Sequence, residues 1–236
     1  MAADLYADGE LALWALKNID STDVGHVITH DPAVEALGRD RGFKTIRGTP
    51  NSIRFDVQPT GLSLHYHSVL SQEVLNRYDR VYNLHPGLLP WGRGYFPVFW
   101  AIWEQTPAGA SLHEVTAALD AGPLVAQCEV GYTDDDTGWT LHRRVFESEQ
   151  TLFRSYWFRL ARGEALPVYQ RSERGTYHSK RQFLDIKKLS SVAQYEASDL
   201  IRLTRALSFP GYSGLEIQLG KKQFELRLSE MEKSDG

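Results

Sequence analysis

Short apolar runs alternate with amphipathic stretches along the first two thirds of the chain. Six runs have the length and composition of strands, at residues 3–6, 24–30, 43–46, 61–67, 79–85 and 108–115. A further strand is expected after the turn at residues 120–122. Helical spacing of apolar residues occurs between these runs, at residues 8–19, 32–41, 71–78 and 96–104, and a long helix is expected from Thr137 to Gly163.

This alternation predicts an α/β fold with a Rossmann-like, mostly parallel sheet and helices on both of its faces. Ligands of such sheets bind beyond the carboxyl ends of the strands. Asn83 and His85 stand at one of these predicted ends. We therefore expect a site near residues 82–103, whose sequence is YNLHPGLLPWGRGYFPVFWAIW.

The pattern changes after Gly163. Residues 164–236 contain one clear helix, at residues 196–209, followed directly by Pro210 and Gly211. Residues 214–230 then alternate between apolar and polar positions as a β-hairpin around residues 220–222. We expect a main domain at residues 1–163 and a small C-terminal α+β segment at residues 164–236 that ends in the hairpin.

Composition narrows the class of protein. The 236 residues suffice for one large domain with an appendage, and 42% hydrophobic and 24% charged residues are ordinary globular values. A net charge of -4 argues against nucleic-acid binding, which requires a clustered basic surface. The single cysteine, Cys128, fits a reducing compartment. No apolar run approaches the roughly 18–20 residues of a membrane helix and residues 1–14 do not resemble a signal peptide, so we expect a cytoplasmic protein without membrane contact.

Asn83, His85 and Asp120 together have the chemistry for acyl transfer to an amine. Residues two apart on a strand share a face, so Asn83 and His85 point the same way while Leu84 points into the core. An imidazole can accept a proton, an amide can donate to an oxyanion, and a carboxylate can stabilise a charged histidine. No Ser or Cys nucleophile adjoins His85, which favours direct transfer without an acyl-enzyme. Each residue alone is weak evidence, because single histidines are more often structural and Asp before Gly usually forms a turn.

The segments NLHPGLLPWGRG, WAIW, LHEV and LDAGPLVAQ, in this order, resemble the folate-dependent formyltransferase family. The resemblance spans about residues 61–153. It implies that Asn83, His85 and Asp120 form a catalytic trio, that N10-formyltetrahydrofolate is the formyl donor, and that no metal is required. It also implies the mechanism, in which an amine attacks the formyl carbon and His85 acts as the base or stabilises charge. Asn83 and His85 would then donate to the oxyanion, while Asp120 orients His85 and relays the proton.

The resemblance further implies a cleft that holds the pterin of folate largely through backbone groups. The matching segments are residues 66–70 and 116–120, and the expected contacts are Tyr66, His67, Val69, Leu70, Ala118, Leu119 and Asp120. One feature departs from the family, whose first strand is strongly apolar. Residues 1–9, MAADLYADG, are short and polar for a central strand. Either this strand is abbreviated or the recorded start is not the natural one.

Branches of this family differ in the amine that they formylate. An enzyme for glycinamide ribonucleotide would end near the first domain, and one for methionyl-tRNA would add a β-barrel and a basic face, which a pI of about 6.1 does not favour. The segment LLPWGRGYFPVFWAIW is most similar to sugar N-formyltransferases that act on nucleotide-linked amino sugars. This similarity predicts a dTDP-linked substrate, dTDP-4-amino-4,6-dideoxyglucose or a 3-amino isomer. The alternatives are a UDP-linked amino sugar and a non-catalytic nucleotide-sugar binding protein, and the intact trio favours an enzyme of carbohydrate biosynthesis.

Aromatic and basic residues beyond the trio are candidates for contacts with the sugar nucleotide. Residues 174–185, RGTYHSKRQFLD, could stack on a base and pair with a pyrophosphate, or could simply be solvated surface. The expected contacts are Trp91, Arg93, Gly94, Tyr95, Tyr177, His178, Lys180, Arg205, Phe209 and Tyr212. Phe99, Trp100 and Trp103 are expected in the core. The hairpin has more apolar residues than it can bury alone, so we expect it to pack on the domain or on a second subunit in a homodimer.

Overall fold

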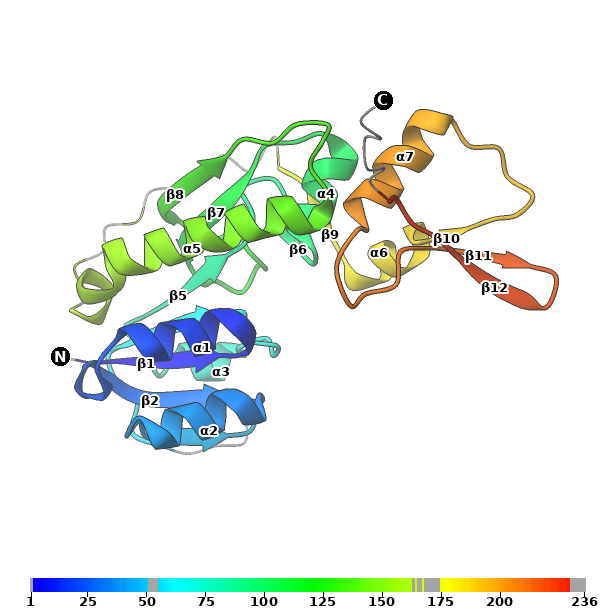
Figure 1. The fold of residues 1–236 in the computed structure, drawn as a ribbon. Helices are drawn as coiled ribbons and strands as arrows, with labels where there is room; N and C mark the ends of the chain where they lie inside the picture. Colours follow the sequence, from blue (N-terminus) through cyan, green and yellow to red (C-terminus); the bar gives the residue numbers. More distant parts are fainter. Residues whose placement is uncertain (1, 51–54, 163, 165–166, 168–174, 230–236) are drawn as a thin grey trace, which may run out of the picture.

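The computed structural model describes residues 2–50, 55–162, 164, 167 and 175–229 (Figure 1). Gly163, the expected end of the long helix and of the first domain, lies outside these ranges. The long helix itself is present as α5 (Gly138–Ala161). Thr137 begins it with a capping box, because its hydroxyl accepts from the Thr140 N–H and the Thr140 hydroxyl accepts from the Thr137 N–H.

A seven-stranded sheet forms the centre of the molecule, in the order β3-β2-β1-β4-β5-β7-β8. Its strands are β1 (Ala3–Ala7), β2 (Val24–Thr29), β3 (Thr45–Arg47), β4 (Thr60–Leu64), β5 (Arg80–His85), β7 (Ala108–Glu114) and β8 (Leu124–Val130). The first five are parallel, and β7 and β8 are antiparallel to their neighbours. The expected α/β fold with a mostly parallel sheet is confirmed.

Helices cover both faces of this sheet because the side chains of each strand alternate in direction. On one face, Leu5 of β1 and Val27 of β2 join the core under α1 (Gly9–Asn18), α2 (Pro32–Asp40) and α5. On the other face, the neighbouring Tyr6 and Ile28 pack with α3 (Gln72–Leu75). Figure 1 shows α1, α2 and α5 in front of the sheet and α3 behind it. The helix expected at residues 71–78 is shorter than predicted, because α3 spans only Gln72–Leu75.

The polar first strand is central and fully buried, between β2 and β4. Asp4 within it is 0% exposed, and its carboxylate accepts hydrogen bonds from the Gln58 N–H (2.9 Å) and the Tyr78 hydroxyl (3.1 Å). His26 Nδ1 lies 3.0 Å from the other carboxylate oxygen. Burial of an aspartate in a central strand is unfavourable unless its carboxylate has hydrogen-bond partners, and these partners supply them.

The C-terminal segment packs against the main domain through its own helices and strands. It contains β9 (Tyr177–His178), α6 (Lys180–Ile186), β10 (Lys188–Leu189), α7 (Ala197–Ala206), β11 (Leu215–Leu219) and β12 (Lys222–Leu226). The hairpin of β11 and β12 is present as predicted, but the expectation of one clear helix is wrong, since α6 is a second. A shared core joins this segment to α4 (Pro97–Glu104) and to the start of α5, and it includes Trp100, Ile102, Leu141, Leu203 and Leu215. Phe99 and Trp100 are buried in it and Trp103 is partly buried, as expected.

Candidate active site

Strand β5 places Asn83 and His85 on one face at the carboxyl end of the sheet. Leu84 between them is 1% exposed and packs in the core on the opposite face. Asn83 lies between Ser63 of β4 and His113 of β7 in the strand register. The antiparallel β7 therefore brings a second histidine next to Asn83.

The chain directly after His85 is held close to the strand by polar contacts. The Ser111 hydroxyl donates to the Gly87 carbonyl (2.7 Å) and accepts from the Leu89 N–H (2.9 Å). The Gln127 side-chain amide donates to the Leu89 carbonyl at 2.7 Å. Gly87 is required here because a Cβ atom at this position would lie 2.6 Å from His85 Nε2. The turn thus passes so close to the imidazole that it leaves no room for a side chain at residue 87.

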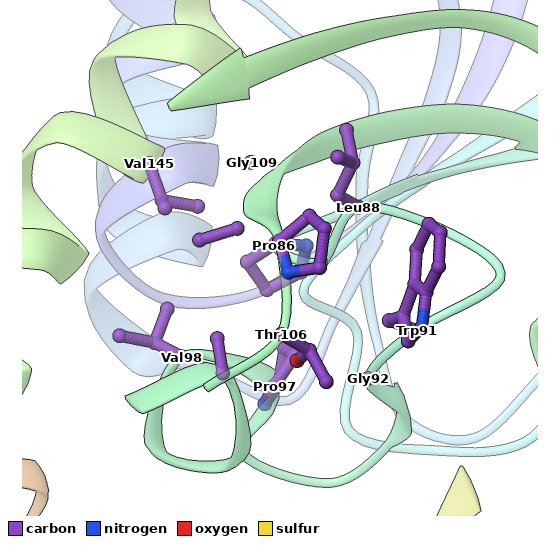
Figure 2. A pocket seen from close by; sticks show the side chains of 13 residues that line it. Pro86, Leu88, Trp91, Gly92, Pro97, Val98, Thr106, Gly109 and Val145 are labelled. Carbon is purple, nitrogen blue, oxygen red and sulfur yellow. The ribbon is translucent and has the colours of Figure 1, made fainter. Parts of the chain in front are cut away.

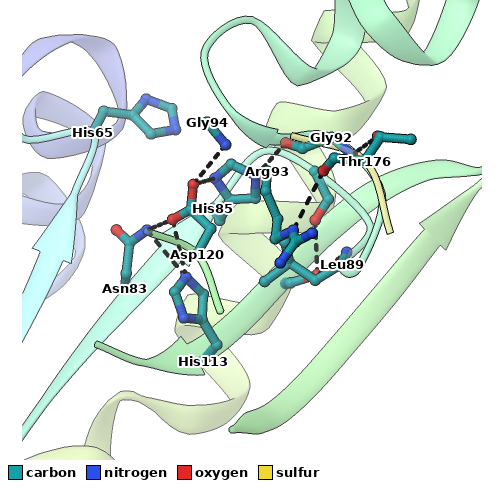
Figure 3. Close-up of polar contacts among 12 residues, drawn as sticks. His65, Asn83, His85, Leu89, Gly92, Arg93, Gly94, His113, Asp120 and Thr176 are labelled. Carbon is teal, nitrogen blue, oxygen red and sulfur yellow. Dashed lines mark hydrogen bonds and ion pairs between the residues drawn. The ribbon is translucent and has the colours of Figure 1, made fainter. Parts of the chain in front are cut away.

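The two ring nitrogens of His85 have different partners (Figure 3). Nε2 lies 2.9 Å from the Gly92 carbonyl, which can only accept, so Nε2 carries a proton and donates it. Nδ1 lies 3.7 Å from Asp120 Oδ2, beyond hydrogen-bond distance but close enough to stabilise a positive ring. In neutral His85 the lone pair is therefore on Nδ1, and this nitrogen is the one able to accept a proton.

Asp120 lies in a turn with φ of 49°, a left-handed conformation that Asp adopts more readily than most residues. Its Oδ2 accepts from the Gly94 N–H at 2.9 Å. Burial opposes ionisation, but the charge of His85, the adjacent His113 and the hydrogen bond from Gly94 outweigh it and hold the pKa of Asp120 well below its usual value. Asp120 is therefore a carboxylate at neutral pH and cannot act as a proton donor there.

His113 is a member of this cluster that sequence reasoning did not identify. It is 2% exposed, its Nδ1 donates to the Glu114 carbonyl at 3.0 Å, and its Nε2 lies 3.5 Å from Asp120 Oδ1. The Asn83 side-chain nitrogen lies 3.3 Å from His113 Nε2 and 3.4 Å from Asp120 Oδ1. Both contacts of the Asn83 amide are long, so a ligand oxygen can compete for its N–H groups. In the sequence, the segment LHEV predicts that His113 lies on a strand, but it does not predict that this strand lies beside Asn83.

The two segments expected to hold folate border this cluster. Residues 66–70 follow β4, and 116–120 connect β7 to β8 and end at Asp120. The buried carboxylate of Asp8 accepts from the His67 N–H at 3.0 Å, and the Tyr66 ring stacks on His30 with centroids 4.9 Å apart. Among the expected contacts, Val69 is 70% exposed, Leu119 is 40% exposed, Ala118 is exposed and Leu70 is half-buried. These segments offer apolar side chains and backbone groups, which fit a flat heterocycle of mixed polarity.

The structure brings seven of the expected sugar-nucleotide residues into one region, around β6 and β9. The short strand β6 (Arg93–Gly94) pairs with β9, so that Arg93 lies beside Tyr177 and Gly94 beside His178. Tyr95 and Tyr177 are 43% and 50% exposed, whereas His178 is buried and stacks on Trp100 with ring centroids 3.7 Å apart. Trp91 precedes β6 and is half-buried. Lys180 is exposed at the first turn of α6, two residues after β9.

Arg205, Phe209 and Tyr212 lie in a different group. The Arg205 guanidinium is buried and donates to the carbonyl and the carboxylate of Asp134. Phe209 packs edge-on against Trp139 and Tyr212. Phe209 and Tyr212 line a cavity of about 240 Å³ between the start of α5, the end of α7 and β12. No contact described for these ranges of the chain joins the three residues to Asn83, His85 or Asp120.

A second cavity lies behind the His85 turn and measures about 10 Å³ (Figure 2). Pro86, Leu88, Trp91, Pro97 and Val98 are among its lining residues. Its volume is close to that of one water probe, so it is too small for a substrate. In the described ranges, no group of three potential metal ligands is close enough to hold an ion, and no helix is long and apolar enough to cross a membrane.

Comparisons with known proteins give one family and several solved structures of similar fold. Residues 62–156 match the family described as formyl transferase. A sugar N-formyltransferase from Shewanella sp. has 23% identity and a TM-score of 0.82, over 99% of each chain. A 4-N formyltransferase from Francisella tularensis has 21% identity and a TM-score of 0.81, over 98% of this chain and 99% of that one.

A third similar structure is the N-formyltransferase from Helicobacter canadensis, in complex with folinic acid and dTDP-3-aminofucose. It has 16% identity and a TM-score of 0.73, over 94% of this chain and 85% of that one. At these identities the structures establish a common fold. The resemblance found in the sequence is confirmed: residues 62–156 match the formyl transferase family, and the chain shares its fold with solved sugar N-formyltransferases.

Proposed function

We propose that this protein transfers a formyl group from N10-formyltetrahydrofolate to the amino group of a nucleotide-linked amino sugar. The observation that carries the proposal is the convergence of Asn83, His85 and Asp120 at one strand end, with His85 Nδ1 as the basic atom. The formyl transferase match over residues 62–156 supports the reaction class. The Helicobacter canadensis complex supports the choice of folate and a dTDP-sugar as ligands.

The chain's own groups account for each proton and charge in this reaction. The amine nitrogen bonds to the formyl carbon, and the bond from that carbon to N10 of the folate breaks. His85 Nδ1 accepts the proton that the amine loses, and the ionised Asp120 at 3.7 Å stabilises the resulting imidazolium. The proton then passes to N10 as it leaves. The Asn83 amide turns from its long contacts and donates to the formyl oxygen as negative charge develops there.

We assign the remaining sites on the same basis. The pterin would lie against residues 66–70 and 116–120, where Val69 and Leu119 are exposed. The sugar nucleotide would lie along Trp91, Arg93, Tyr95 and Tyr177, which β6 and β9 bring side by side. We retain the division into a catalytic domain at residues 1–163 and an accessory segment at residues 164–236. A dTDP-linked 4-amino or 3-amino dideoxysugar remains the proposed substrate, in a cytoplasmic homodimer.

The test measures tetrahydrofolate release from N10-formyltetrahydrofolate in the presence of dTDP- and UDP-linked amino sugars. Turnover with at least one amino sugar is expected, and dTDP sugars should be preferred. His85→Asn should lower kcat by about 10²–10⁴-fold, the usual contribution of a general base, while calorimetry shows unchanged sugar binding. Binding without turnover by the wild type would identify a nucleotide-sugar binding protein instead. If the wild type shows no sugar binding and no turnover, the proposed function is excluded.

A further inference from the structure

The strand β9 lies directly against the chain that surrounds His85 and Asp120. The Thr176 N–H donates to the Pro90 carbonyl (3.2 Å), and the Tyr95 N–H donates to the His178 carbonyl (2.9 Å). Gly175 allows this approach, because a Cβ atom there would lie 2.4 Å from the Pro90 carbonyl oxygen. A segment more than 80 residues later in the sequence thus forms the backing of residues 90–95.

Thr176 makes two contacts with the backbone around Gly92 (Figure 3). Its hydroxyl oxygen accepts from the Gly92 N–H at 2.9 Å, and its carbonyl accepts from the Arg93 N–H at 3.1 Å. The Arg93 N–H belongs to the same peptide group as the Gly92 carbonyl. That carbonyl, on the opposite side of the peptide, accepts the Nε2 proton of His85 at 2.9 Å. Thr176, Gly92 and His85 therefore form one continuous line of hydrogen bonds.

Gly92 cannot hold this position alone. Its φ of 66° lies in the left-handed region, and glycine has the greatest backbone freedom of any residue. A Cβ atom at Gly92 would also lie 2.9 Å from Pro97 Cβ, so no other residue can supply stiffness here. The restraint must come from its partners, and Thr176 supplies the only side-chain partner that the described contacts give to the Gly92 N–H.

We propose that Thr176 is a positioning residue for His85, which keeps the Gly92 carbonyl aligned with Nε2 and so leaves Nδ1 as the proton acceptor. Without the Thr176 hydroxyl, the Gly92 N–H loses its restraint, and rotation about the backbone angles of Gly92 can turn its carbonyl away from His85. The Thr176 carbonyl, bonded to the Arg93 N–H, then remains as the contact from Thr176 that opposes this rotation. The imidazole would then populate the other tautomer, whose Nδ1 carries a proton directed at Asp120 and cannot accept one from an amine. This inference rests on the proposed function for its kinetic consequence, but not for its structural one.

The decisive substitution is Thr176→Val, which replaces the hydroxyl by a methyl group of similar size. Loss of one neutral hydrogen bond with an unpaired N–H should lower kcat by about tenfold, with KM for the sugar within about twofold. Thr176→Ser keeps the oxygen and should restore kcat to within about twofold of the wild type. Thr151→Val, at an exposed position on α5, is the control for a generic Thr-to-Val effect and should leave kcat unchanged.

A readout without turnover separates this inference from the proposed function. NMR of protein labelled with ¹⁵N-histidine should show His85 with protonated Nε2 in the wild type and in Thr176→Ser, and a mixture of tautomers in Thr176→Val. Should Thr176→Val fail to fold in a thermal melt, Thr176→Ala removes the same oxygen with a smaller side chain and takes its place. Unchanged tautomer signals in the variant that lacks the hydroxyl would overturn the inference, as would equal losses of kcat in the Ser and Val variants.

Discussion

The contact between Gly87 and His85 gives a sharp prediction for Gly87→Ala. A Cβ atom at position 87 would lie 2.6 Å from His85 Nε2, 2.9 Å from His85 Cδ2 and 3.0 Å from Pro97 Cβ. Carbon contacts are comfortable at about 3.5 Å, so the imidazole must move by about 0.9 Å. The ring is buried and its Nε2 already bonds to Gly92 at 2.9 Å, so such a movement breaks that bond.

The expected loss of activity follows from this displacement. A misplacement of about 1 Å at a catalytic group can lower the rate by about 10²-fold. Folding should suffer much less, because the φ of Gly87 lies outside the left-handed region and alanine can adopt its backbone. Overpacking would cost about 1–3 kcal/mol, offset in part by about 0.4–1 kcal/mol gained from a stiffer unfolded chain. Activity and stability should therefore separate.

Steady-state kinetics and urea unfolding of the same preparation check this separation. The control is Gly131→Ala, where a Cβ atom would meet nothing within 4 Å and the φ is also compatible with alanine. It should match the wild type in kcat and in the free energy of unfolding to within about 1 kcal/mol. If Gly87→Ala kept a kcat within about twofold of Gly131→Ala, the imidazole would not be held as tightly as its contacts indicate, and the reasoning would be refuted.

Two further predictions concern stability and assembly. Burial opposes protonation of His65, but the fully buried Glu149 at 2.7 Å from its Nε2 outweighs this and raises the pKa of His65. The pair therefore contributes fully to stability below about pH 6.5, and this contribution is lost as the pH rises through the pKa of His65 in the folded protein. The free energy of unfolding should fall more between pH 6 and 9 in the wild type than in Glu149→Gln. Parallel curves for the two proteins would contradict this. The hairpin leaves Phe224, Leu226 and Leu228 exposed, which predicts that a second subunit covers them. Light scattering at micromolar concentration should therefore give a dimer for the wild type and a monomer for Phe224→Glu. A monomeric wild type would exclude this interface.

The positions of Asn83 and His85 at the end of β5 could be predicted because they follow the simple periodicity of a strand. Asn83 and His85 lie two apart, so their shared face could be inferred from strand geometry alone. Asp120 joins them in the sequence analysis through the chemistry of a carboxylate with a histidine and through the resemblance, and the structure places its carboxylate between Asn83, His85 and Gly94. Local patterns of this kind require no knowledge of how distant segments pair.

What the sequence could not predict depends on pairing between distant segments. His113 joins the cluster because β7 runs antiparallel to β5 in a register that its own residues do not encode. Thr176 and the Gly92 carbonyl act through backbone groups, which leave almost no trace in residue identity. Arg205 carries a charge that suits a pyrophosphate, yet its guanidinium is used inside the protein by Asp134.

The helix α6 was missed for a different reason. Its seven residues are too few for a clear helical period, and its aromatic and basic residues suggested a ligand contact instead. The Ser179 hydroxyl and the Gln182 side chain form a capping box at its start. This four-residue signature was present in the sequence and would have predicted the helix.

The pairing of β9 with residues 93–94 also has a consequence for how the protein is made. His85 leaves the ribosome early, whereas Thr176 follows about 90 residues later, and at roughly 5–20 residues per second this delay lasts roughly 5–20 s. In the later part of that interval the nascent chain contains Asn83, His85 and Asp120 without the strand that backs the turn around Gly92. Synthesis therefore supplies Thr176 well after Asn83, His85 and Asp120, and a chain released before Thr176 would carry the proposed reacting residues without the proposed partner that aligns them.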